Sequence, residues 1–237
     1  RCKGEFHDFG ILYASLLGCV RHNNRHRFYR IAGIIAVACR QNICKYLIIE
    51  QYFCADHTSL TDGMCESAIK SLIKNAHICL REPENYEARG EFMVDCSLAC
   101  NNILSIGNSP SGWPCHGIEH ALSAYYDITH GEGLAIITPH WMRKILNENT
   151  LERFVSFGTH IFGIDASLAE NEIAEKTIEA TYKLFESFGI PMHLREVGID
   201  EKRLGEMAHH IAVNEGLDKA WAPLSEQDIF DILEASL

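Results

Sequence analysis

Three histidines within one short stretch of the chain have the residue type and spacing of metal ligands. His116 and His120 are four residues apart, so they lie on the same face of a helix. His130 comes just before Gly131, at a break between two predicted helices where the chain can turn its ring toward that face. Neutral imidazole is a common ligand of divalent transition metals, and three convergent rings suit Fe²⁺ or Zn²⁺. The spacing predicts a metal site; the alternative is that surface or core histidines are grouped here by chance.

A zinc protease is another metalloenzyme in which paired helical histidines occur. Such proteases carry His-Glu-x-x-His, in which the glutamate next to the first histidine acts as general base. Here the segment is His116-Gly-Ile-Glu119-His120, so the glutamate precedes the second histidine instead. This position argues against a metalloprotease.

The composition is that of a folded, acidic protein. Apolar residues make up 47% of the 237 residues and the net charge is −11, which argues against binding to nucleic acid or to an anionic membrane surface. No apolar run is long enough for a transmembrane helix, and residues 1–20 lack the order of a signal peptide. The ten cysteines include no Cys-x-x-Cys pair, so we expect reduced, mostly buried thiols and a cytoplasmic location.

Helical periodicity dominates from about residue 57, and no alternating strand pattern follows it, so we predict an all-α fold. Thr58 or Thr61 can cap the first helix, and Ser225-x-x-Asp228 resembles a capping box before the last one. The apolar run 31–39 is compatible with either a helix or a strand. The predicted helices span from about residue 58 to 80 and then 86–104, 113–126, 133–146, 151–162, 170–188, 202–214 and a short segment after residue 225.

The first 50 residues differ from the rest in charge. They hold eight lysines and arginines but three acidic residues, although the whole chain is strongly acidic. Such asymmetry is typical of a tail, a partner site or a foreign segment. The basic run 21–30 is compatible with nucleic-acid binding, but a solvated stretch is the favoured interpretation.

The histidine-rich stretch resembles the signature of iron-containing alcohol dehydrogenases, in particular their butanol dehydrogenase branch. Its sequence is Trp-Pro-Cys-His-Gly-Ile-Glu-His-Ala-Leu-Ser-Ala-Tyr-Tyr-Asp-Ile-Thr-His-Gly-Glu-Gly-Leu-Ala-Ile, residues 113–136. The likeness extends over about residues 48–237. Four further blocks agree with that branch in order and spacing: Glu50–Phe53, Asn85–Arg89, Pro139–Met142 and Pro223–Glu226.

The resemblance implies a fold, a reaction and roles for single residues. The fold is the multi-helix C-terminal domain of the iron-containing alcohol dehydrogenase and dehydroquinate synthase-like proteins. In the family one Asp and three His hold Fe²⁺ or sometimes Zn²⁺, and a hydride passes between a primary alcohol such as butanol and NAD or NADP. By motif position His116 and His130 are two of the metal ligands. His120 matches a histidine beside the metal, close to nicotinamide and substrate, with a positioning or proton-transfer role; for Trp113 simple packing is favoured.

Two departures from the family bear on activity. The family's remaining ligands, Asp-x-x-x-His, fall on Ile43 and Leu47, and neither side chain can bind a metal. Nothing in residues 1–50 resembles the Gly-rich turn of the family's N-terminal α/β domain, which binds the cofactor pyrophosphate. We therefore expect that domain to be missing, and little or no turnover from this chain alone.

These departures divide the chain into an atypical segment, 1–47, and a helical metal-binding domain, 48–237. One hypothesis is that the first segment is a frame-shifted or unrelated translation joined to a truncated gene. The rival is a divergent segment that supplies replacement ligands, with four candidates: His7, Asp8, His22 and His26. The alternative to an alcohol or aldehyde oxidoreductase is a non-catalytic helical domain that associates with a partner or with itself as a homodimer.

Overall fold

The computed structural model describes residues 43–237, with side chains from residue 48 onward. The apolar run 31–39, the basic run 21–30 and the four candidate replacement ligands lie outside the described residues. Within the described part every regular element is a helix, so the predicted all-α class is confirmed.

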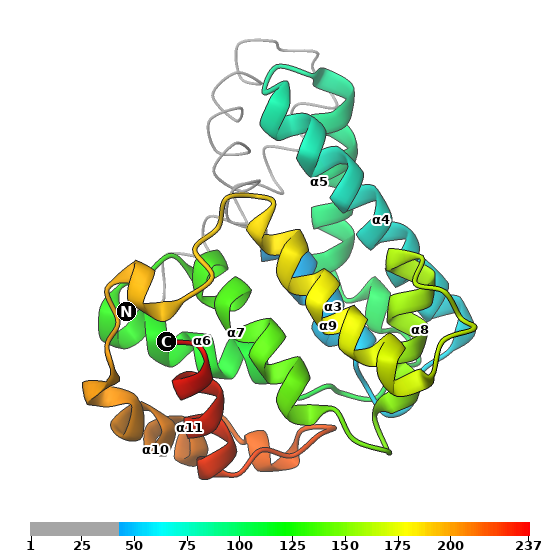
Figure 1. Cartoon of the computed structure of the whole chain (residues 1–237). Coiled ribbons are helices and arrows are strands. Elements are labelled where there is room, and N and C mark those ends of the chain that lie inside the picture. The colour runs from blue at the N-terminus through cyan, green and yellow to red at the C-terminus, as the bar shows by residue number, and fades with distance from the viewer. Residues whose placement is uncertain (1–42) are drawn as a thin grey trace.

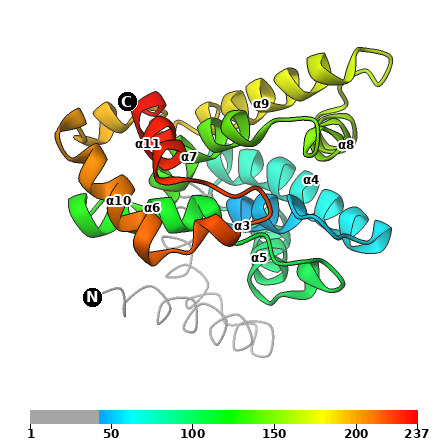
Figure 2. The same cartoon turned by 90° about the horizontal axis from the view of Figure 1, so that it is seen from below.

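Helices that follow one another in the chain mostly pack as pairs (Figure 1). Figure 2 shows α6, α10 and α11 gathered on one side of the molecule, and α4, α8 and α9 on the other. The α-helices are α3 (Ile43–Tyr52), α4 (Ser59–Arg81), α5 (Tyr86–Cys100), α6 (Pro114–Tyr126), α7 (His130–Ile145), α8 (Leu151–Phe162), α9 (Glu170–Glu186), α10 (Leu204–Asn214) and α11 (Glu226–Ala235). Short 3-10 turns occupy Ile103–Ser105, Leu194–Val197, Glu201–Arg203 and Leu217–Lys219.

Helices α3 and α7 form the centre of the fold. Helix α3 contacts α4, α5 and α7, and α7 also contacts α6, α9 and α11. Five consecutive α3 residues, 48–52, are buried. Consecutive residues point to all sides of a helix, so α3 is enclosed rather than laid on a core by one face. The sequence did not predict α3 because an enclosed helix has no amphipathic stripe.

Helix ends agree with the predicted signals in most places. The Thr58 hydroxyl accepts the backbone N–H of Thr61 at 3.1 Å and caps α4. The Ser225 and Asp228 side chains form the predicted capping box of α11. These local signals work because backbone groups at a helix end need partners whatever the rest of the fold does.

Two predicted boundaries differ from the structure by three residues or more. Helix α5 ends at Cys100 instead of residue 104, because Asn102 takes a left-handed conformation (φ 63°) and the chain turns into a 3-10 helix. Helix α7 begins at His130 rather than at residue 133, so the break after α6 covers only residues 127–129. As a result His130 lies in the first turn of a helix, which holds its backbone more firmly than a loop would.

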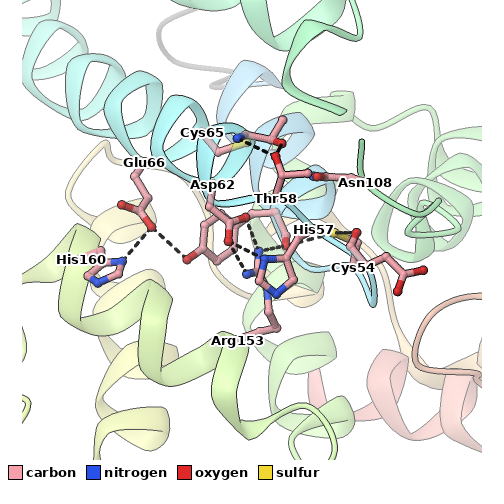
Figure 3. Close-up of polar contacts among 12 residues, drawn as sticks. Cys54, His57, Thr58, Asp62, Cys65, Glu66, Asn108, Arg153 and His160 are labelled. Atoms are coloured by element: carbon pink, nitrogen blue, oxygen red, sulfur yellow. Dashed lines mark hydrogen bonds and ion pairs between the residues drawn. The ribbon is translucent and has the colours of Figure 1, made fainter. Parts of the chain in front are cut away.

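An ion pair between the buried Arg153 and the half-buried Asp62 joins α8 to α4 (Figure 3). The Arg153 guanidinium donates to both carboxylate oxygens of Asp62, at 2.7 and 2.9 Å, and also to the carbonyl oxygen of Tyr52. Its central carbon lies 4.0 Å from the centroid of the Tyr52 ring. The Tyr52 hydroxyl donates to Glu66, which is also paired with His160 at 2.8 Å. This network fixes the end of α3 between α4 and α8.

Candidate metal centre

Helices α6 and α7 bring the three histidine rings together. The ring centroids of His116 and His130 are 5.3 Å apart, and those of His120 and His130 are 5.9 Å apart. The centroids of His116 and His120, one helical turn apart on α6, are separated by 6.3 Å. The break at residues 127–129 is short enough to return the chain so that His130 faces α6.

His116 is paired with a buried carboxylate from another helix. Glu50, on α3, is fully buried, and one of its oxygens, Oε2, is hydrogen-bonded to Nδ1 of the His116 ring. The other, Oε1, accepts the backbone N–H of Cys115 at 2.6 Å. Helix α6 begins after Trp113 without a side-chain cap from its own segment, so Glu50 supplies that cap. The same carboxylate therefore caps the N-terminus of α6 and orients His116, the first histidine of that helix.

His130 has a matching arrangement. Glu119, on α6, is fully buried, and its Oε2 is hydrogen-bonded to Nδ1 of His130. The hydroxyl of Ser123 donates to its Oε1. A Cβ atom at Gly133 would lie 2.7 Å from Cγ of Glu119, so the lack of a side chain at that position is what admits the carboxylate.

The two glutamates are the functional residues that sequence reasoning missed. Glu119 lies inside the histidine-rich motif, where its position argues against a protease base and suggests no other role. Glu50 belongs to a family block, Glu50–Phe53, to which the sequence assigns no role. Neither pairing follows from helical spacing alone, since Glu50 and His116 are 66 positions apart in the chain.

His120 lies in a more open environment than the other two histidines. Its side chain is 53% exposed, against 12% for His116 and 13% for His130. Its Nδ1 is 3.8 Å from a carboxylate oxygen of Glu215. Its ring lies at 17° to the His130 ring, so the two are stacked. This position allows proton exchange with solvent beside the two buried rings.

Trp113 packs its ring edge-on against His116, with centroids 5.2 Å apart and planes at 84°. Its backbone is left-handed (φ 51°) at the start of α6. Such a conformation is uncommon for a large side chain and holds the indole beside the histidine.

His116 and His130 suit a divalent transition metal as two imidazole ligands. A histidine that ligates a metal through one ring nitrogen usually gives the other N–H to a carboxylate or carbonyl. At both residues one ring nitrogen, Nδ1, faces a carboxylate oxygen. The backbone of Ile43 and Leu47 lies on α3, but their side chains are outside the described set. Among the side chains that the structure describes, no group of three or more His, Cys, Asp or Glu is placed to hold one ion. The described donor set is thus a pair.

Comparison with known proteins identifies the family. The profile described as "Fe-containing alcohol dehydrogenase family, C-terminal" matches residues 47–237. The chain belongs to the iron-containing alcohol dehydrogenase family. The resemblance inferred from the histidine-rich stretch is confirmed, and so is the fold, which is that of the C-terminal domain of iron-containing alcohol dehydrogenases.

The relatives in this iron-containing alcohol dehydrogenase family include butanol dehydrogenases. The chain is 43% identical over 189 residues to NADH-dependent butanol dehydrogenase A of Clostridium acetobutylicum, covering 79% of this chain and 48% of that protein. The structure of a butanol dehydrogenase from Thermotoga maritima aligns with a TM-score of 0.75 and 30% identity, over 81% of this chain and 50% of the other. The chain spans about half the length of the relatives it matches.

The fold extends to more distant family members. The aldehyde reductase YqhD of Escherichia coli aligns with a TM-score of 0.78 at 23% identity, over 85% of this chain and 53% of that one. At that identity the likeness concerns the fold alone. In the described part of the chain no helix is both long and apolar enough to span a membrane.

Proposed function

We propose that residues 48–237 form the metal-holding domain of an alcohol and aldehyde oxidoreductase, in which His116 and His130 ligate Fe²⁺ or Zn²⁺. The observation that carries the proposal is the pairing of both histidines with buried carboxylates through Nδ1. That arrangement is expected of metal ligands. The names of the relatives add the substrate class, primary alcohols such as butanol, and the hydride carrier, NAD(H) or NADP(H).

We assign different roles to the three histidines according to their side-chain exposure. His116 and His130 are largely buried and hold the ion. When bound, a divalent ion supplies Lewis acidity toward an alcohol or aldehyde oxygen. His120, which is half exposed, carries a proton between the site and solvent, and the carboxylate of Glu215 lies beside it. We expect little or no turnover from this chain alone, because Ile43 and Leu47 occupy the positions of the family's other two ligands.

A cobalt titration tests the ligand assignment. Purified, metal-free chain is titrated with Co²⁺, and the affinity is compared among wild type, His116→Ala, His130→Ala and His120→Ala, with the exposed His209→Ala as control. We expect the two ligand variants to bind at least about 10-fold more weakly, and the other two to bind like wild type. Unchanged affinity in both ligand variants would contradict the proposal. An assay with butanal and NADH or NADPH then measures turnover.

A non-catalytic helical domain is the second candidate. It is favoured by Ile43 and Leu47, which occupy the positions of the family's other two ligands. Two imidazoles hold a divalent ion less firmly than the three or more protein ligands of an ordinary catalytic site. Near-stoichiometric metal in protein purified without oxygen would argue against this candidate.

We also propose a cytoplasmic location and, as one assembly, a homodimer. Among the described cysteines, Cys54, Cys65 and Cys115 are buried free thiols, as suits a reducing compartment. Light scattering on the purified chain measures the assembly directly.

A further inference from the structure

We propose that Glu50 and Glu119 are positioning residues that keep a proton on Nδ1 of His116 and His130, so that Nε2 is the nitrogen each ring offers to a divalent cation. A neutral imidazole carries one ring proton, and the partner of one nitrogen decides which nitrogen keeps it. That a metal binds Nε2 rests on the function proposed above, whereas the position of the proton on each ring does not.

Both carboxylates are fully buried, which is costly unless every oxygen has a partner. Each has one oxygen satisfied by a donor other than the histidine, Cys115 N–H for Glu50 and the Ser123 hydroxyl for Glu119. The second oxygen of each faces Nδ1 of its histidine. An ionised carboxylate only accepts hydrogen bonds, so Nδ1 must be the donor in both pairs.

The two sites differ in how the first oxygen is held, and this difference makes the inference testable. The partner of Glu50 Oε1 is a backbone N–H, which can only donate. In Glu50→Gln the amide oxygen must therefore stay on the side of Cys115, and the amide NH₂ faces Nδ1 of His116. Nδ1 then becomes an acceptor, and the ring proton moves to Nε2.

The partner of Glu119 Oε1 is a hydroxyl, which can donate or accept. The Ser123 hydroxyl also lies 3.3 Å from the carbonyl oxygen of Ile128, to which it can turn its proton. In Glu119→Gln the amide can therefore place its NH₂ toward Ser123 and its oxygen toward His130. Nδ1 of His130 keeps its proton, so the same chemical change leaves this ring as it was.

Nitrogen-15 NMR of the metal-free full chain at alkaline pH reads the position of each ring proton. We expect wild type to show the Nδ1–H form at both His116 and His130. Glu50→Gln should show Nε2–H at His116, Glu119→Gln should leave His130 unchanged, and the exposed Glu148→Gln is the control. Nε2–H at both rings in wild type, or no change at His116 in a folded Glu50→Gln, would overturn the inference.

Cobalt titration of the same proteins separates this inference from the proposed function. Glu50→Gln should lower the Co²⁺ affinity by about 10–100-fold, whereas Glu119→Gln should change it little. If wild type shows the expected ring protons but binds no Co²⁺, the proposed function fails and the assignment of the two glutamates stands. If Co²⁺ binds equally well to wild type and Glu50→Gln although the ring proton has moved, the role of Glu50 toward the cation is wrong.

Discussion

Glu119 occupies the space that a side chain at Gly133 would need. A Cβ at position 133 would lie 2.7 Å from Cγ of Glu119, closer than real contacts allow, and 3.0 Å from its Oε1, which is a tight contact. Gly133→Ala should therefore displace the carboxylate from His130, weaken Co²⁺ binding and cost about 1–3 kcal/mol of unfolding free energy. Co²⁺ titration and urea denaturation measure the two effects.

Gly63 provides the matched control for that substitution. It is also a helical glycine, on α4, but a Cβ there would meet nothing within 4 Å. Gly63→Ala should leave Co²⁺ binding unchanged and stabilise the fold by up to about 1 kcal/mol, because alanine favours a helix. Equal effects of the two substitutions would show that Gly133 is not needed to admit Glu119.

His140, on α7, makes stability depend on pH. Burial, together with the nearby His193 and Arg143, lowers its pKa from 6.5 to about 4. Between pH 6.5 and 4 the unfolded chain binds this proton and the folded chain does not, so folding loses stability as the pH falls through that window. His140→Gln should remove this pH-dependent loss, which amounts to about 3 kcal/mol.

Urea denaturation at several pH values, with wild type and His140→Gln in parallel, measures that difference. The exposed His209→Gln serves as control and should keep the wild-type slope. An unchanged slope for the His140 variant would contradict the low pKa of His140 in the folded state.

At the scale of elements, the fold depends on how α3 is held. Helix α3 is enclosed by α4, α5 and α7, and its last residues are fixed through Arg153 and Asp62. Burial by itself raises the pKa of Asp62, but the hydrogen bonds and charge of Arg153 outweigh it and leave the pKa lowered. The Asp62 carboxylate is thus ionised although it is half-buried, and its charge is stabilised by Arg153.

Arg153→Met should destabilise the chain strongly, because it removes the cation that is bonded to both oxygens of the Asp62 carboxylate, which then keeps only His57 at 2.7 Å. Removing one member of a buried ion pair costs about 3–5 kcal/mol. Arg143→Met is the comparison, since Arg143 pairs with Glu175 at 2.8 Å on the surface and both side chains are more than half exposed. That surface change should cost at most about 1 kcal/mol. Urea midpoints that fall equally in both variants would contradict the structural role of Arg153.

At the scale of the whole molecule, metal binding and folding are linked. The two ligands lie on α6 and α7, and Glu50 on α3 orients one of them, so the site exists only when three helices are packed. Free Co²⁺ at about 100 times its Kd should stabilise the fold by about 2.7 kcal/mol and raise the melting temperature by about 5–10 °C. A chelator should reverse the shift.

Thermal unfolding followed by circular dichroism measures this linkage. The double variant His116→Ala/His130→Ala should not respond to Co²⁺. The same shift in wild type and in the double variant would place the bound metal elsewhere on the molecule.

The sequence alone was sufficient for the family, the all-α class and most helices. Helix caps such as Thr58 and Ser225 are local, and the spacing of His116 and His120 already places them on one face. It was less successful where long-range packing decides. Helix α3 was not predicted because it is enclosed. The predicted start of α7 lies three residues after the observed one because nothing local marks His130 as the first residue of the helix.

What tertiary structure decided is the pairing of each histidine with a carboxylate. Whether Glu50 reaches His116 depends on how α3 packs against the start of α6, and helical periodicity carries no information about that distance. The chain sequence therefore determined which residues are candidate ligands. Only the packing of α3, α6 and α7 decided which nitrogen of His116 and of His130 faces a buried carboxylate, because a buried charge must find its partner wherever the fold brings one.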